Sequence, residues 1–307
     1  MEMAQNNNLQ NYARISGVLV SKSVTNGTNK SGEYKSIDLV VRANEDEHQI
    51  RLYSNKFKAD GTENKIYKSL ETIENEYKTI EKDGLENAEK INITGNLSTN
   101  RYVGQDGQLK EFRQIRTNFA NRHDKGEFEA KSDFAIKGVV DTISPKYTEE
   151  GDIELLEINL IVPIFDGNGY KEEIDKIKFV VRESAFFDYI DENFTKGTVV
   201  QLGGTLINRP DKNVPVQQVG FGKMPISRTR KINEYLCTGG QVLNGLEEIS
   251  PYTDEEVNKA LEKFNQKLVE LQSKKTSNDV ASNNLSNTIN NSQGQGFGDI
   301  NLDDIPF

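Results

Sequence analysis

The stretch YARISGVLVSKSV at residues 12–24 decides the fold, because the chain returns to it as FAIKGVVDTISP at residues 134–145. In both stretches apolar and polar residues alternate, as in a strand with one buried face. A glycine breaks the alternation at the same place in each, Gly17 in the first and Gly138 in the second. We interpret the pair as the first strand of two copies of one fold.

A second pair of stretches supports this repeat. INITGNLSTNR at residues 91–101 returns as VVQLGGTLINRP at residues 199–210, with Gly204 in the place of Gly95. The same alignment matches Leu206 with Leu97, and Asn208 and Arg209 with Asn100 and Arg101. Two landmarks in the same order predict a tandem duplication with a shorter second copy. The alternative is that unrelated strands carry glycine at bulges.

The first copy has the element order of an OB-fold. Alternation predicts strands at 34–43 and 48–54, and apolar residues three and four apart predict an amphipathic helix over 62–83. Two further strands, 90–102 and 108–120, are joined by a hairpin loop that contains glycine. Three strands, a helix and a hairpin follow one another in the OB-fold, a small Greek-key barrel.

The second copy repeats this order. We expect strands at 154–165 and 170–182, a short helix at 184–194 with Ser184 as its N-cap, a strand at 199–210 and the last barrel strand at 213–224. Residues 226–245 are then an extra strand or a loop over the barrel.

The predicted fold class is therefore mainly β: two tandem OB-fold domains, a C-terminal helix and a disordered acidic tail. The units are a flexible N-terminus at 1–11, OB-fold domains at 12–125 and 131–250, an amphipathic helix at 251–275, and a linker with an acidic tip at 276–307. From Thr276 onward the chain is rich in Asn, Ser, Gln and Gly, and such a composition does not build a core.

The predicted C-terminal helix begins with a capping box, Thr253 with Glu256. Its apolar residues repeat four and three apart, at Val257, Leu261, Phe264, Leu268 and Leu271. We expect this stripe to pack on the second barrel, and self-association through the stripe is the alternative.

No pattern in the sequence predicts catalysis. A Walker phosphate loop, a GxSxG nucleophile motif and a metalloprotease His-Glu pattern are absent from it. Cys237 is the single cysteine, so we expect no internal disulfide and a small buried thiol. His48 and His123 are the two histidines, both expected in solvent, so a zinc site of nitrogen and sulfur ligands is excluded. We predict a protein that is not an enzyme and holds no cofactor or metal.

The sequence has no apolar run long enough to span a bilayer and no signal-peptide core, which predicts a cytoplasmic protein. Its net charge is -10, but the charge is unevenly distributed along the chain. Residues 101–122 carry five Lys and Arg against two acidic residues, and residues 209–235 carry six against two. The acidic residues concentrate elsewhere, which is compatible with a basic groove and an acidic appendage.

OB-folds bind single strands through a cationic face that carries aromatic side chains. The candidates in the first copy are Tyr34, Lys35, Arg51, Tyr53, Lys56, Phe57, Arg101, Tyr102, Phe112, Arg113 and Arg116. Those in the second copy are Tyr170, Lys178, Phe179, Arg182, Arg209, Lys212, Phe221, Lys223, Arg228 and Arg230.

Alternation assigns some of these candidates to a face. Arg51 and Tyr53 point one way and their neighbours in the strand point into the barrel. Phe112 and Arg113 point to opposite sides of their strand, and either side could be the core. Tyr53 and Tyr102, each beside cations, are expected on the binding face.

The last residues, DDIPF, resemble the C-terminal tip of bacterial single-stranded DNA-binding proteins (SSB). Asp303, Asp304, Ile305, Pro306 and Phe307 match that tip residue by residue. In that family an OB-fold core is followed by a disordered linker and an acidic tip, which docks replication, recombination and repair proteins. The resemblance implies that Phe307 fills an apolar pocket of a partner while the aspartates meet a cationic rim.

The rest of the chain departs from the family pattern, because it has two predicted barrels and no tryptophan. It is expected to be a monomer or a small homo-oligomer. The divergent core beside a conventional tip suggests a phage or mobile-element protein, in the bacterial cytoplasm or a phage-infected host cell. The function implied is sequence-tolerant coating of single-stranded DNA, with recruitment of DNA-processing enzymes through the tip. The alternative is an interaction module or decoy that uses the tip and binds DNA weakly.

Overall fold

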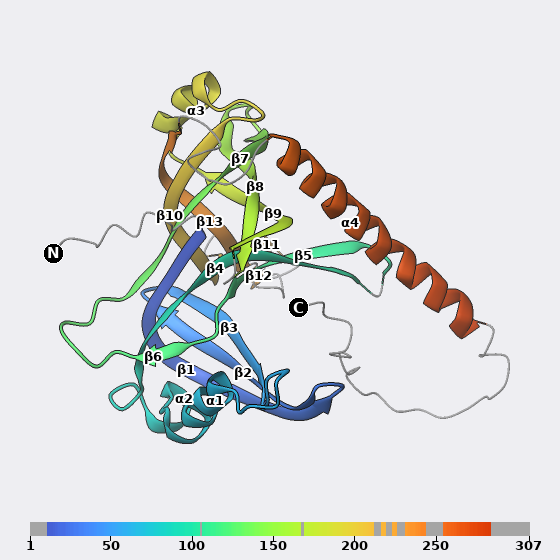
Figure 1. Ribbon diagram of the computed structural model, residues 1–307. Helices are drawn as coiled ribbons and strands as arrows, with labels where there is room; N and C mark the ends of the chain where they lie inside the picture. The colour runs from blue at the N-terminus through green and yellow to red at the C-terminus, as the bar shows by residue number, and fades with distance from the viewer. Residues whose placement is uncertain are drawn as a thin grey trace.

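A computed structural model of the chain describes residues 11–104, 106–166, 169–211, 216–218, 223–225, 231–243 and 254–283. Two β-barrels lie one above the other, and the long helix α4 (Asp254–Asn283) runs diagonally along one flank (Figure 1). None of the helices in these ranges is long and apolar enough to cross a membrane.

The first barrel is built on a long curved strand, β1 (Asn11–Asn29), that pairs with strands on both sides. Its elements are β2 (Gly32–Ala43), β3 (Asp46–Asn55), α1 (Lys65–Glu76), α2 (Ile80–Asp83), β4 (Lys90–Val103), β5 (Leu109–Arg116) and β6 (Ala120–Arg122). Strand β1 pairs with β2 and β4, β2 continues to β3, and β4 continues to β5 and β6. The helices lie between strands three and four, as expected for an OB-fold.

The second barrel is a closed ring of five strands. Its elements are β7 (Lys131–Tyr147), β8 (Ile153–Asp166), β9 (Gly169–Val181), a 3₁₀ turn (Ser184–Phe186), α3 (Phe187–Asn193), β10 (Val199–Pro210) and β13 (Lys231–Val242). The ring runs β7–β8–β9–β13–β10 and returns to β7, with β13 parallel to β9. The fold is therefore mainly β, with two OB-fold barrels and a C-terminal helix.

The two barrels are related by a pseudo-two-fold axis through the pair of strands β1 and β7. Ala13 lies opposite Phe134, its counterpart in the repeat, and the pairing is reciprocal on either side: Asn11 with Ile136 and Ile15 with Ser132. Reciprocal pairing is the geometry of an isologous dimer interface. The chain is thus built as a fused dimer with one continuous core and one shared sheet.

The glycines that revealed the repeat are required by close strand approach. Gly95 lies opposite Ala13 and Gly204 lies opposite Phe134, which makes them equivalent. A Cβ at Gly95 would collide with the Arg116 carbonyl oxygen, and one at Gly204 would collide with that of Leu236. The same strand crossing therefore excludes a side chain at the same place in both barrels.

Two buried aspartates lock the barrels together in equivalent ways. Thr99 donates its backbone N–H to Asp175 (2.7 Å), and Asn208 donates its backbone N–H to Asp46 (2.8 Å). Asp46 pairs with Ala43 across β2–β3, and Asp175 occupies the same place across β8–β9. These equivalent hydrogen bonds make Asn208 the counterpart of Thr99, and Arg209 the counterpart of Asn100. The sequence alignment, which matched Asn208 with Asn100 and Arg209 with Arg101, was therefore displaced by one residue.

The last strand of the second barrel is β13, and the expectation of residues 213–224 was wrong. Strands β10 and β13 keep pairing out to Pro210 and Lys231, so the chain between them forms a connection. Within that connection β11 (Val216–Gln218) and β12 (Lys223–Pro225) pair with each other as a separate ribbon. Alternation buries Tyr235 and Cys237 from β13 in the core.

Three helix predictions also need correction. The helix expected over 62–83 breaks after Glu76, because the Thr79 side chain caps α2 and Lys22 binds backbone carbonyls at the end of α1. Ser184 begins a 3₁₀ turn rather than capping the helix that follows. Helix α4 runs on to Asn283, beyond the expected end at 275.

Two predictions of burial have opposite outcomes. Cys237 is buried, as expected. His48 is also buried, although it was expected in solvent, because alternation along β3 places it on the inward face together with Ile50. The predicted capping residue Thr253 lies outside the described residues.

Candidate nucleic-acid interface

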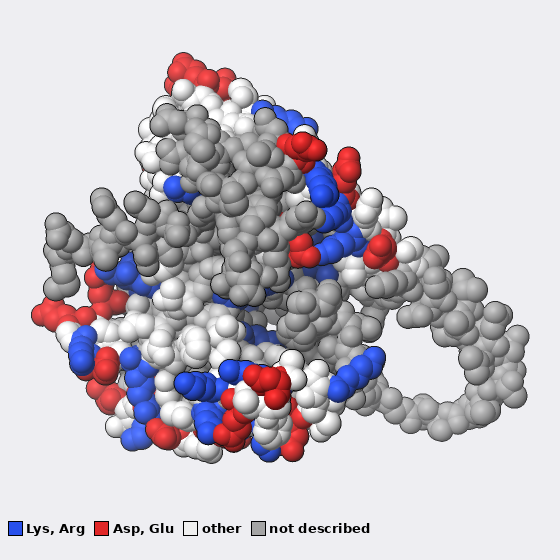
Figure 2. Space-filling view, viewed as in Figure 1, with Lys and Arg blue, Asp and Glu red and all other residues white. Residues whose placement is uncertain are grey.

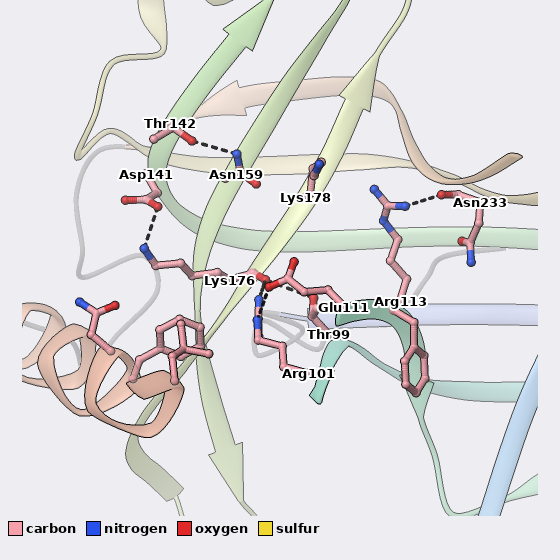
Figure 3. Close-up of a pocket in the computed structure, with 14 residues that line it drawn as sticks. Thr99, Arg101, Glu111, Arg113, Asp141, Thr142, Asn159, Lys176, Lys178 and Asn233 are labelled. Carbon is pink, nitrogen blue, oxygen red and sulfur yellow. Dashed lines mark hydrogen bonds and ion pairs between the residues drawn. The ribbon is translucent and has the colours of Figure 1, made fainter. Parts of the chain in front are cut away.

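A groove of about 570 Å³ lies where three elements meet: the outer face of β8–β9, the β4–β5 hairpin of the first barrel, and α4 (Figure 3). It is lined by Thr99, Arg101, Glu111, Phe112, Arg113, Asp141, Thr142, Asn159, Lys176, Lys178, Asn233, Phe264, Asn265 and Leu268. Four of these side chains are basic and two are acidic, so the lining carries an excess of positive charge.

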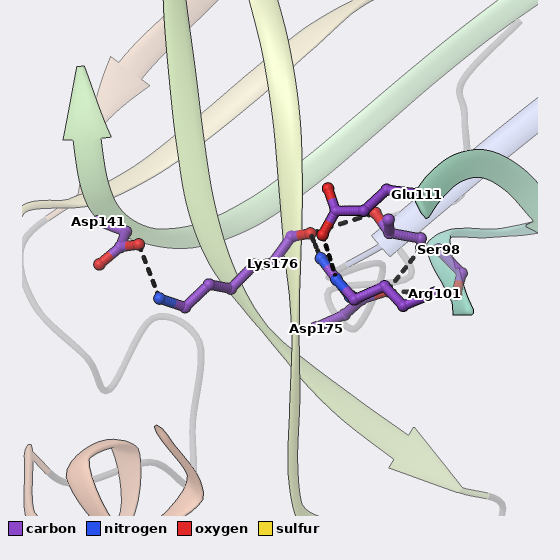
Figure 4. A network of polar contacts seen from close by, with 7 residues as sticks. Ser98, Arg101, Glu111, Asp141, Asp175 and Lys176 are labelled. Atoms are coloured by element: carbon purple, nitrogen blue, oxygen red, sulfur yellow. Dashed lines mark hydrogen bonds and ion pairs between the residues drawn. The ribbon is translucent and has the colours of Figure 1, made fainter. Parts of the chain in front are cut away.

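Arg101 anchors the β4–β5 hairpin to the second barrel (Figure 4). Its Nη1 lies 2.6 Å from Asp175, with both side chains under a tenth exposed, and its Nε lies 2.6 Å from Glu111. Asp175 also accepts a hydrogen bond from the Ser98 hydroxyl. Because two carboxylates already hold Arg101, its main role is to position the hairpin that forms one wall of the groove.

Lys176 and Lys178 project from the outer face of β9 toward the groove, because residues two apart in a strand share a face (Figure 3). Lys176 lies 2.9 Å from Asp141, and Lys178 lies 3.3 Å from Glu157. These ion pairs are partly exposed, so each is weak in water and an incoming phosphate can compete for the lysine. Asn159, directly opposite Lys178 on β8, donates a hydrogen bond to the Thr142 hydroxyl (2.8 Å).

Arg113 is the groove cation least neutralised by its neighbours. Its guanidinium donates to the Asn233 carbonyl and lies 5.4 Å from the centre of the Tyr235 ring. No carboxylate among the described residues forms an ion pair with it. Burial lowers the pKa of the Arg113 guanidinium, which still remains charged at neutral pH. A partly desolvated cation bonded to a neutral carbonyl keeps its attraction for an anion.

Two aromatic side chains, Phe112 and Phe264, line the groove. Phe112 is 45% exposed on the β4–β5 hairpin and packs edge-to-face with Tyr102, which is 47% exposed. Ile115, on the other side of the same strand, is buried in the core, so the side that carries Ile115 is the inward one. The centre of the Phe264 ring, from α4, lies 4.9 Å from the guanidinium carbon of Arg101 and 5.8 Å from Lys176 Nζ.

The first-barrel candidates between residues 34 and 57 are not among the residues that line the groove. Tyr34 and Tyr53 stack with ring centres 5.3 Å apart near the end of the β2–β3 hairpin. Arg51 is exposed and lies 2.7 Å from Asp38. Lys56 lies 2.7 Å from Glu33 and over the exposed ring of Phe57.

Two candidates are buried instead of exposed. Lys35 is enclosed between strand β2 and helix α1, where it forms an ion pair with Glu74 and lies 5.4 Å from the Tyr67 ring. Phe179 is fully buried and packs against Phe134 and Tyr235 in the second barrel. Neither side chain offers a surface to a ligand.

The remaining candidates are dispersed. Arg116 is exposed on β5, Arg182 lies 2.7 Å from Glu234 at the end of β9, and Arg209 lies 3.4 Å from Glu45. The Arg182 ion pair raises the pKa of its guanidinium. The backbones of Tyr170 and Lys223 lie in β9 and β12, but their side chains are outside the described part of the structure. Residues outside it altogether are Lys212, Phe221, Arg228, Arg230, Asp303, Asp304, Ile305, Pro306 and Phe307.

Among the basic and aromatic residues of the groove, two were missed by sequence reasoning, Lys176 and Phe264. Lys176 shares the face of Lys178 by simple alternation, so the pattern that selected one could have selected both. Phe264 belongs to the apolar stripe of α4, and no local signal distinguishes a ring that packs on a barrel from one that lies over cations at a groove.

Fold and groove together define the chain as a tandem OB-fold protein with a polar, aromatic-bordered groove between its barrels. Within that class, a family model described as YorF matches residues 10–276, and the chain belongs to this family. No curated protein sequence matches the chain.

Several solved structures share features of the fold at low sequence identity. The single-stranded DNA-binding protein from Thermus aquaticus, in a deletion mutant, is 16% identical over 80% of this chain and 97% of its own, with a TM-score of 0.46. A Plasmodium falciparum SSB in complex with ssDNA is 21% identical over 39% of this chain and 97% of its own, with a TM-score of 0.26. A Replication Protein A heterotrimer bound to ssDNA is 10% identical over 67% of this chain and 47% of its own, with a TM-score of 0.23.

Proposed function

We propose that this protein binds single-stranded DNA without sequence preference, along the groove between the second barrel and the β4–β5 hairpin. The observation that carries the proposal is that one groove brings together Lys176 and Lys178, on the strand-two and strand-three face of the second OB-fold, with Phe112 and Arg113 of the β4–β5 hairpin. Aromatic rings stack on bases of any identity, and the cations follow the phosphates.

The groove lies between a barrel face, a hairpin and a helix, and Phe112 and Phe264 are among the residues that line it. In this proposal the protein coats exposed strands during replication, recombination or repair. Residues 303–307 would recruit DNA-processing enzymes, as the tip of SSB does.

The test is a titration of fluorescent oligo-dT at two salt concentrations. Phe112→Ala removes a stacking surface that is 45% exposed, and it should weaken binding by about 1–3 kcal/mol, the usual effect of losing one stacked base. Arg113→Gln should also weaken binding and should reduce the dependence of log K on log salt by about 0.7.

Lys68→Gln serves as the matched control, since Lys68 is an exposed cation on α1, remote from the groove, that lies 2.5 Å from Glu63. It should bind as the unaltered protein does. Absence of binding by the unaltered protein, or an affinity indifferent to salt, would rule out the proposal.

A second candidate function is an interaction module that uses residues 303–307 and binds DNA weakly. The ion pairing of Arg101, Lys176 and Lys178 with carboxylates favours it, because each pair reduces the charge offered to phosphate. Deleting residues 303–307 distinguishes the two functions. If the protein is a single-stranded DNA-binding protein, its DNA binding should survive the deletion. If it is an interaction module, the deletion should abolish its function, because that function depends on the tip.

A further inference from the structure

The pseudo-two-fold axis makes each position on the outer face of one barrel comparable with a position on the other. Val40 pairs with Gln49 in the first barrel, and Asn159 pairs with Lys178 at the same place in the second. The next outward pair along is Arg42 with Glu47 in the first barrel.

Its counterpart in the second barrel is Ile161 with Lys176. Both barrels carry the same bulge between strands one and two, after Leu19 and after Val140, which fixes this equivalence.

At these equivalent positions only the second barrel carries a net positive charge. The second barrel has Lys176 and Lys178, whereas the first has the neutral Gln49 and one acidic residue, Glu47. Glu47 is in turn held by Arg42, at 2.6 and 2.9 Å. Figure 2 shows basic and acidic side chains interspersed over the first barrel, in the lower part of the view. Lys176 and Lys178 also pair with carboxylates, but the groove holds Arg113 in addition, which has no carboxylate partner among the described residues. The first-barrel face therefore offers a phosphate chain less net attraction than the groove does.

The wall formed by α4 is also specific to the second barrel. Val257 and Ala260 of α4 are buried against a small apolar cluster that includes Ile161 and Ile174. The first barrel has charged residues at the equivalent places, where Arg42 takes the position of Ile161. A helix could not pack there without burying charged side chains. The first barrel therefore lacks the apolar surface on which a helix equivalent to α4 could pack.

We infer, on the basis of the proposed function, that the two barrels have unequal roles: each chain has one single-strand site, on the second barrel, and the equivalent face of the first barrel is not a second one. The first barrel contributes the β4–β5 hairpin as a wall of that site, through Arg101 and Arg113. A short oligonucleotide should therefore bind with a stoichiometry of one per chain.

The test compares two double variants that each remove two positive charges. Lys176→Gln with Lys178→Gln alters the second barrel, and Arg42→Gln with Arg51→Gln alters the equivalent face of the first. The lysine variant should weaken oligo-dT binding about tenfold or more at low salt and reduce the log–log salt slope by about 0.7 for each lysine. The arginine variant, with the same net charge, should change affinity less than about threefold.

Thermal unfolding of each variant shows whether the fold is kept. If the lysine double variant unfolds, the oligo-dT affinity of Lys178→Gln alone, at an exposed position, tests the same face. Equal losses of affinity in the two double variants, a larger loss in the arginine variant, or two oligonucleotides bound per chain would overturn the inference. Each of these results requires that the unaltered protein binds DNA, whereas failure of the proposed function is seen as no binding at all.

Discussion

His48 and Ile177 occupy the same place in the two barrels, each opposite a buried residue of the neighbouring strand, Val41 and Leu160. His48 is buried, and its Nε2 has no hydrogen-bond partner among the described residues. Burial lowers the pKa of His48 from 6.5 to about 4, because the charged ring would lose its hydration. The imidazole is therefore neutral in the folded protein at physiological pH.

This shift makes His48 a source of acid sensitivity. The unfolded chain binds a proton near pH 6.5 and the folded chain only near pH 4, so the free energy of unfolding falls as pH decreases between these values. Replacing His48 by isoleucine should reduce the loss of stability between pH 7 and pH 4.5 by about 2–3 kcal/mol. Urea unfolding at the two pH values measures it. An equal loss in both proteins would show that His48 does not titrate in this way.

At the scale of the element, α1 ends through a contact that its own sequence does not contain. Lys22, on β1, donates from Nζ to the carbonyls of Ile73 (2.7 Å), Glu74 (2.6 Å) and Tyr77 (2.7 Å). The Ile73 carbonyl also accepts the backbone N–H of Tyr77, the C-cap residue of the helix. The dipole at the C-terminus of a helix favours a cation at this place. The helical periodicity of 62–83 therefore predicted a longer helix than forms.

Lys22→Met keeps the aliphatic stem of the side chain and removes the three hydrogen bonds. The expected cost is about 1.5–3 kcal/mol, the usual range for hydrogen bonds made by a charged group. Amide hydrogen exchange of α1 should accelerate in the variant, and Lys68→Met, on the exposed side of the same helix, is the control. Unchanged exchange in α1 would mean that water replaces the Lys22 hydrogen bonds to these carbonyls without loss of helix stability.

At the scale of the whole molecule, we expect the two barrels to unfold as one cooperative unit. They share a sheet through β1 and β7, a continuous core, and the equivalent buried aspartates Asp46 and Asp175. Calorimetry should accordingly show a single unfolding transition with equal calorimetric and van't Hoff enthalpies.

The contact of Asp175 with Arg101 can be tested within that unit. Asp175→Asn keeps an acceptor for the Thr99 N–H and leaves Arg101 without one of its two carboxylates, at a buried site. The expected loss of stability is about 3–5 kcal/mol, the cost of breaking a buried pair from one side. Asp38→Asn, which breaks the exposed pair with Arg51, should cost less than about 1 kcal/mol. Similar losses in the two variants would contradict the role given to Asp175.

Local pattern was sufficient for much of the fold. Alternation identified the inward and outward faces of β3, where Ile50 and Leu52 are buried and Arg51 is exposed. The apolar stripe of α4 predicted packing on the second barrel, and Val257 is buried there. The last barrel strand was misplaced, because β10 and β13 pair far beyond the barrel and the connection between them has strand-like residues of its own.

By itself the sequence determined the duplication, the OB-fold order of each copy and the inward faces of the strands, because these follow from residue spacing and from glycines where strands cross. The burial of Lys35 and the meeting of Arg113, Lys176 and Phe264 in one groove come from the tertiary structure. So does the net positive charge of the second barrel at positions where the first barrel is neutral overall. These properties depend on which distant strands pair and in which register, and no local pattern of residues encodes that information.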